Sequence, residues 1–163
     1  MSVSKVPALA PRSNLSSRPR PSSHVVQFYE EDPQLITELG RLIGNALAKG
    51  ESAIVVATGA HRDGLALELA ARGLDVAALT AAGRYTAFDA EQTLTRILAD
   101  QMPDEDKFSE LLGRTITKAK DSAKSPEPCI VIFGEMVALL WSSGKHSAAI
   151  RLEELWNGLA EQH

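Results

Sequence analysis

Residues 129–135 read CIVIFGE, and the helical pattern MVALLW follows at 136–141. The five apolar residues at 129–133 include three β-branched ones and predict a buried strand. Gly134 and a single acid, Glu135, follow this strand, and a helix begins at once. Open α/β sheets bind ligands at the carboxyl ends of their strands. Glu135 is therefore the first candidate for a binding residue.

Three further strands are predicted upstream, and each is followed by a helical pattern. They are HVVQFY at 24–29, SAIVVA at 52–57 and RYTAF at 84–88. Residues 74–79 are ambiguous between a short strand and a helical turn. Strands that alternate with helices predict a three-layer α/β/α fold, with a mainly parallel sheet of about four to five strands.

The predicted helices have apolar stripes and recognisable ends. The first is expected between Asp32, a natural N-cap, and Gly50, which stops it. Thr58 and Asp89 are expected to cap two later helices, the second of which is predicted to reach Met102. The first helix should turn one stripe to the core: Leu35, Leu39, Leu42, Ile43, Ala46 and Leu47.

The composition is that of an ordinary globular domain, with 163 residues, 44% hydrophobic and 23% charged. No apolar run approaches the roughly 18 residues that a membrane helix needs. The single cysteine, Cys129, is expected to be a buried and inert thiol. A cytoplasmic location fits both observations.

The charge is distributed unevenly along the chain. The net charge is −4, from 17 basic and 21 acidic residues. Residues 1–23 contain four basic residues and no acid, so the remainder carries −8. This Pro- and Ser-rich segment is predicted to be a disordered tail that precedes one domain at 24–163. An acidic domain would repel a phosphate backbone, which argues against nucleic-acid binding.

Several catalytic and cofactor motifs are absent from the sequence. The turn after the first predicted strand is FYEEDP at 28–33, which offers acids rather than a phosphate-binding loop. There is no G-x-G-x-x-G, no G-x-S-x-G and no H-E-x-x-H. The four histidines lack metal-ligand spacing and are each interpreted as isolated surface or loop residues. We therefore expect no enzyme activity, no cofactor and no metal.

Polar residues at the predicted strand ends form the remaining candidate site. They are Tyr29, Glu30, Thr58, Asp89 and Glu135. In a parallel sheet they emerge at one edge, where helix N-termini also gather.

Structural alternatives stay open for these residues. Thr58 and Asp89 could serve only as helix caps. Glu135 needs a partner, which Arg151 or Arg84 could supply as a structural ion pair. The acids could also bind a divalent cation, although the sequence favours this least.

Five blocks of the sequence, which span about residues 24–163, together resemble the MEDS domain, the sensory domain of methanogens, methylotrophs and the DcmR repressor. The blocks are HVVQFYEEDPQLI, ESAIVVATGAHRDGLALEL, FDAEQTL, FGEMVALLW and RLEELWN. The resemblance implies a RecA/KaiC-like core without a P-loop and a sensory or regulatory role. It implies no catalytic role. It adds Trp141 and Arg151 to the candidate ligand-binding residues, among these family motif positions: His24, Phe28, Tyr29, Glu30, Glu135, Trp141, Arg151, Glu154 and Trp156.

One departure from the family pattern concerns the end of the chain. Family members usually continue into a further short strand, whereas this sequence stops at His163. It also contains no kinase, receiver or helix-turn-helix segment. We therefore expect a stand-alone sensory domain or a fragment of one. Without that strand, residues 24–29 would form an unpaired edge that can mediate a homodimer.

The resemblance, together with the absence of catalytic motifs, implies a regulatory module of bacterial signal transduction. It would bind a small organic ligand at the sheet edge and pass the signal to a histidine kinase or a transcription regulator. An alternative is a pure protein-interaction module that regulates such a partner. A degenerate nucleotide-binding protein is the weaker alternative.

Overall fold

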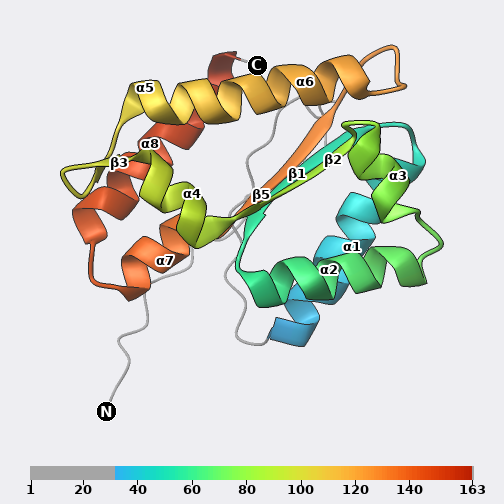
Figure 1. Ribbon diagram of the computed structural model, residues 1–163, viewed down its shortest axis with the longest axis horizontal. Helices are drawn as coiled ribbons and strands as arrows, with labels where there is room; N and C mark the ends of the chain where they lie inside the picture. The colour runs from blue at the N-terminus through green and yellow to red at the C-terminus, as the bar shows by residue number, and fades with distance from the viewer. Residues whose placement is uncertain (1–31, 163) are drawn as a thin grey trace, which may run out of the picture.

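The computed structural model describes residues 32–162 (Figure 1). The predicted tail at 1–23 and the predicted first strand at 24–29 lie outside these residues. The candidate residues Tyr29 and Glu30, and the proposed dimer edge, therefore lie outside them too.

The main sheet of residues 32–162 has three parallel strands in the order β2-β1-β5. The strands are β1 (Ser52–Ala57), β2 (Tyr85–Asp89) and β5 (Ile130–Gly134). Every residue of β1 is buried, because this central strand has helices on both faces. The prediction of a parallel α/β fold is confirmed. The described part of the sheet has fewer strands than the four to five predicted.

One face of the sheet is covered by the first three helices. Ala53 and Val55 of β1 point to this face and pack with Leu39 and Leu65. Residues 74–79, which the sequence left ambiguous, enter a helical turn that Asp75 caps. The helices of this face are α1 (Asp32–Ala48), α2 (Gly59–Ala71) and α3 (Val76–Ala81).

The helices from α4 onward cover the opposite face (Figure 1). Ile54 and Val56 of β1 point to this face. A π-helical turn, η1, joins α5 to α6 in one continuous rod. The elements of this face are α4 (Ala90–Ile97), α5 (Glu105–Phe108), η1 (Ser109–Gly113), α6 (Arg114–Ser122), α7 (Met136–Ser142) and α8 (His146–Gln162).

A short hairpin follows α4, where the sequence predicted a longer helix. The helix ends at Ile97, and β3 (Leu98–Ala99) pairs antiparallel with β4 (Met102–Pro103). The two turn residues, Asp100 and Gln101, have φ angles of 48° and 67°. Two successive positive φ angles are typical of a tight hairpin turn. The predicted continuation of the helix to Met102 is wrong for this reason.

Glycines allow α1 and α2 to pack closely. A Cβ at Gly40 would overlap Cγ of Glu68, and one at Gly44 would lie 3.3 Å from Cδ of Arg72. Glu68 and Arg72 form an ion pair of 2.9 Å along α2, beside these glycines. The predicted stripe of α1 is buried except for Leu42, which is 47% exposed.

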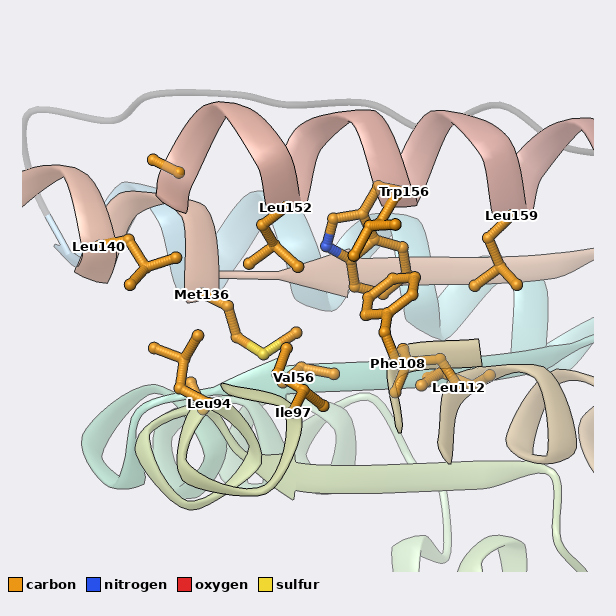
Figure 2. Packing of buried hydrophobic residues seen from close by; sticks show 14 of the residues in the cluster. Val56, Leu94, Ile97, Phe108, Leu112, Met136, Leu140, Leu152, Trp156 and Leu159 are labelled. Carbon is orange, nitrogen blue, oxygen red and sulfur yellow. The ribbon is translucent and has the colours of Figure 1, made fainter. Parts of the chain in front are cut away.

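Trp156 of α8 lies at the centre of the larger hydrophobic core (Figure 2). Its ring meets Phe108 edge-to-face, with the centroids 5.0 Å apart and an interplanar angle of 88°. The indole also lies beneath Gly134, where a Cβ would be 3.5 Å from the ring. The last residue of β5 thus rests on the core directly before Glu135.

Candidate functional site

The carboxyl ends of the three parallel strands bring the predicted polar residues to one edge. Ala57 of β1 is in register with Asp89 of β2, and Val56 is in register with Gly134 of β5. Thr58, Asp89 and Glu135 therefore emerge at the same edge, as the sequence predicts. The first turn of α2 begins at this edge, directly after Thr58.

Among residues 32–162, Glu135 is the more sheltered of the two acids at these strand ends, with 13% of its side chain exposed against 23% for Asp89. Its Oε2 accepts a hydrogen bond of 2.7 Å from the backbone N–H of Thr58. Its Oε1 contacts Nδ1 of His61, whose side chain is 16% exposed. The N–H of Glu135 donates to the carbonyl of Val56 at 2.9 Å. Glu135 therefore links the start of α7 to the start of α2, across the end of β1.

The predicted arginine partners of Glu135 are wrong. Arg151 pairs with Glu105 at 2.9 Å and with Glu154 at 3.4 Å, which ties α8 to α5. Arg84 is buried and donates to backbone carbonyls elsewhere.

His61 was missed as the partner because it was interpreted as an isolated histidine. One signal in the sequence could have identified it. His61 is the third residue of the helix that follows Thr58. The first turn of a helix after a parallel strand lies at the same sheet edge as the strand ends.

Asp89 makes a second polar connection at this edge. Its Oδ1 accepts from the backbone N–H of Gln92 at 2.9 Å, so the predicted cap of α4 is confirmed. Its Oδ2 accepts from Nη2 of Arg62 at 2.8 Å. The backbone N–H of Gln92 and the Arg62 guanidinium hold the pKa of the Asp89 carboxyl below its usual value. Asp89 thus remains ionised and links β2 to α2.

Thr58 occupies the N-cap position of α2, but its side chain makes no capping hydrogen bond. The predicted capping role of this side chain is wrong. Its contribution comes from the backbone instead. The Thr58 N–H binds Glu135, and its carbonyl accepts from the N–H of Arg62 at 2.9 Å.

Tyr85 is a buried polar residue on the same face of β2 as Asp89. Among residues 32–162, neither its hydroxyl nor Nε of Arg62 has a hydrogen-bond partner. Burial raises the pKa of the Tyr85 hydroxyl, and the positive charge of Arg62 opposes that rise. The Tyr85 hydroxyl and the Nε–H of Arg62 could therefore each form one more hydrogen bond near the Asp89–Arg62 pair.

Trp141 lies away from this edge of the sheet, and Trp156 supports the edge only from the core, beneath Gly134. Trp141 lies near the opposite end of α7 from Glu135, is 46% exposed and stacks on His146 with centroids 4.4 Å apart. Trp156 is a core residue. Of the predicted ligand-binding residues inside the described range, three lie at the edge: Thr58, Asp89 and Glu135.

Three further observations concern the cysteine, possible metal sites and membrane helices among residues 32–162. Burial, followed by the negative charge of Glu51, raises the pKa of the half-buried Cys129 thiol and disfavours the reactive thiolate. No group of three or more His, Cys, Asp or Glu side chains within 32–162 could hold a metal ion. None of the helices in this range is long and apolar enough to span a membrane.

The pH dependence of stability offers a test of the Asp89–Arg62 pair. Asp89→Asn keeps an acceptor for Gln92 but removes the ion pair, so the variant should be less stable at neutral pH. A lowered folded-state pKa stabilises the fold above the unfolded-state pKa of about 3.9, and this contribution is lost as the pH falls through the folded-state value. In urea denaturation, the stability difference between the two proteins should therefore shrink below about pH 4. A difference that stays constant down to about pH 2 would contradict this role of the charge.

Comparison with known proteins identifies the family of the chain. The model of the MEDS family, the methanogen/methylotroph, DcmR sensory domain, matches residues 23–163. Comparisons with curated proteins and with solved structures gave no match. Because the family match covers nearly the whole sequence, the chain belongs to the MEDS family of sensory domains.

Proposed function

We propose that this chain is a cytoplasmic regulatory module that binds a small organic molecule at the carboxyl edge of its sheet. It acts by binding rather than by catalysis and passes the signal to a partner protein. The observation that carries the proposal is the contact of Glu135 with His61 and with the Thr58 N–H. Membership of a sensory-domain family supports the regulatory role.

The chemistry of Glu135 suits reversible recognition. The carboxylate is sheltered but not sealed from solvent, so a polar group of a ligand can reach it. An ionised acceptor in such a position forms stronger hydrogen bonds than one in bulk water. A ligand donor that binds Glu135 would compete with the bonds that now hold the start of α2. Binding would therefore change the connection between α2 and α7.

The position of α7 suggests how the signal reaches a partner. The helix begins directly after Glu135 and carries Trp141 near its other end, where the indole is half-exposed and stacks on His146. A change at Glu135 would be transmitted along two turns of helix to this aromatic pair. A histidine kinase or a transcription regulator is the class of partner that we propose. The exposed Trp141 also favours the second candidate function, a module that works through protein contacts alone.

A ligand screen with a Glu135 variant tests the proposed site. Small organic molecules are added to the purified chain, and thermal unfolding is recorded. A ligand at about 100 times its Kd should add about 2.7 kcal/mol to the free energy of unfolding. Glu135→Gln should abolish this stabilisation, because the amide loses the charge. The variant should itself fold, since its carbonyl can still accept from Thr58 and its amide can face His61.

The control for this screen is Glu154→Gln, which alters an exposed acid of α8 that pairs with Arg151. It should leave the ligand-induced shift unchanged. A shift that survives in Glu135→Gln would place the ligand elsewhere and defeat the proposal. The interaction module would be favoured by two results together. No compound in the screen stabilises the chain, and the chain captures a partner protein that the Trp141→Ala variant does not capture. Calorimetric binding of ATP with Mg²⁺ would instead support the nucleotide-binding alternative, which rests on the RecA/KaiC-like relation that remains a prediction.

A further inference from the structure

A surface hollow of about 360 Å³ lies between α4 and the rod formed by α5, η1 and α6. These elements are neighbours in the layer above the sheet (Figure 1). The volume is at the lower end of the range for small-molecule sites. The hollow is lined by Arg96, Lys107, Glu110, Leu111, Arg114 and Thr115. None of these residues belongs to the sheet edge that contains Glu135.

The lining of the hollow is positively charged, although the domain as a whole is acidic. Arg96 comes from α4, Lys107 from α5 and Arg114 from α6, against one acid, Glu110 of η1. Cations from three successive helices therefore converge on one concavity. A local charge of this sign attracts anions from solution.

The existing contacts of these cations leave them available to a ligand. Within residues 32–162, Arg96 has no ion-pair partner. Arg114 pairs with Glu110 at 3.1 Å, but the two side chains are 79% and 63% exposed. Exposed pairs of this kind contribute little to stability. Within the same range, the ammonium group of Lys107 makes one long hydrogen bond, of 3.3 Å, to the carbonyl of Leu98. An anion could therefore engage all three cations at little cost to the fold.

The π-helical turn η1 forms one side of the hollow. Such turns are rare in proteins, and those that occur often lie at functional sites. The turn spans Ser109–Gly113 and includes Glu110 and Leu111, two residues of the lining. The hydroxyl of Thr115 donates to the carbonyl of Leu111 at 2.7 Å. The half-buried Leu111 adds an apolar surface beside the cations.

From these observations we infer that the hollow between α4 and the α5–α6 rod is a second ligand site, which binds a small dianion. The fitting chemistry is a phosphate monoester or a dicarboxylate with a short carbon skeleton. Arg96 and Arg114 hold the anionic group with bidentate hydrogen bonds, Lys107 adds a third charge, and Leu111 contacts the carbon skeleton. The site is separate from the sheet edge of the proposed function.

The test uses phenyl phosphate and succinate as probes, with the intact chain at constant ionic strength. Binding is followed by amide chemical-shift changes in NMR titrations. Both Arg96→Gln and Arg114→Gln should raise the Kd of the bound probe about tenfold or more, since each removes a charge-assisted hydrogen-bonding group. The amides of α4, η1 and α6 should report the largest changes. The two probes distinguish phosphate from dicarboxylate recognition.

Two matched variants control the test. Arg41→Gln removes another exposed arginine that pairs within its helix, with Glu38 of α1, and should leave the Kd unchanged. Glu135→Gln should also leave the Kd of the probe unchanged. A failure of the second site can therefore be distinguished from a failure of the proposed ligand site at Glu135. The inference is overturned if neither probe binds, or if Arg41→Gln weakens binding as much as Arg96→Gln. It is equally overturned if Glu135→Gln alone abolishes binding, because the anion would then occupy the sheet edge.

Discussion

Replacing Trp156 with alanine is expected to lower the free energy of unfolding by about 3–5 kcal/mol, the usual cost of truncating a buried aromatic side chain. Trp156 is 4% exposed and fills the space between α8, Phe108 and the end of β5 (Figure 2). Its loss leaves a cavity beneath Gly134, and the close packing of the core prevents full collapse. The loss should therefore also loosen the position of Glu135.

Urea denaturation measures this effect, and the second tryptophan supplies the control. Trp141 is 46% exposed, so Trp141→Ala should cost less than about 1 kcal/mol. A double-mutant cycle with Phe108→Ala should give a coupling of about 0.5–1.5 kcal/mol, because the two rings meet edge-to-face. Equal destabilisation by Trp156→Ala and Trp141→Ala would show that the core is not organised around Trp156.

The second large effect is expected for Arg84→Met, which should cost about 3 kcal/mol. Arg84 is 7% exposed, and its Nη2 donates to the carbonyls of Leu47 at 2.5 Å and of Glu51 at 2.8 Å. These carbonyls lie at the end of α1 and just before β1, where the helix dipole also favours a cation. Methionine retains the apolar stem but removes the donor to both carbonyls, so within residues 32–162 the carbonyl of Leu47 keeps only its hydrogen bond of 3.2 Å from the N–H of Gly50.

Chemical denaturation combined with hydrogen exchange can locate this loss. The amides of Lys49 and Gly50, which bond to the last carbonyls of α1, should exchange faster in Arg84→Met. Arg72→Met is the control, because its ion pair with Glu68 is partly exposed and local, and it should cost less than about 1 kcal/mol. Similar losses for the two variants would contradict a special role for Arg84 in joining α1 to the sheet.

The predictable parts of the fold are those that local sequence determines. The run at 52–57 is apolar throughout because it forms the central strand, and its predicted bounds match β1. Asp89 was correctly predicted as a cap because its capping contact is only three residues away. The hairpin after Ile97 could not be predicted in the same way, since Leu98, Ala99 and Met102 also suit a helix. Its turn depends on the positive φ angles of two residues that are not glycine.

The candidate site was predictable in its position but not in its partners. Parallel strands place Thr58, Asp89 and Glu135 at one edge whatever their detailed contacts, so the pattern of strand ends sufficed. The contact between His61 and Glu135 joins residues 74 positions apart. Such a choice depends on how α2 is rotated over the sheet, which no local pattern encodes. Arg151 offered the ideal charge for Glu135, but helix packing directs it to α5 instead.

The two polar pairs at the sheet edge together fix the orientation of α2. Glu135 holds the first turn from the side of β5, and Asp89 holds it from the side of β2, with β1 between them. A helix attached at two points on opposite sides cannot rotate about its axis unless one attachment breaks. Release of Glu135 alone would leave Arg62–Asp89 as a pivot, about which the start of α2 could turn while its buried residues Leu65 and Leu69 stay in the core.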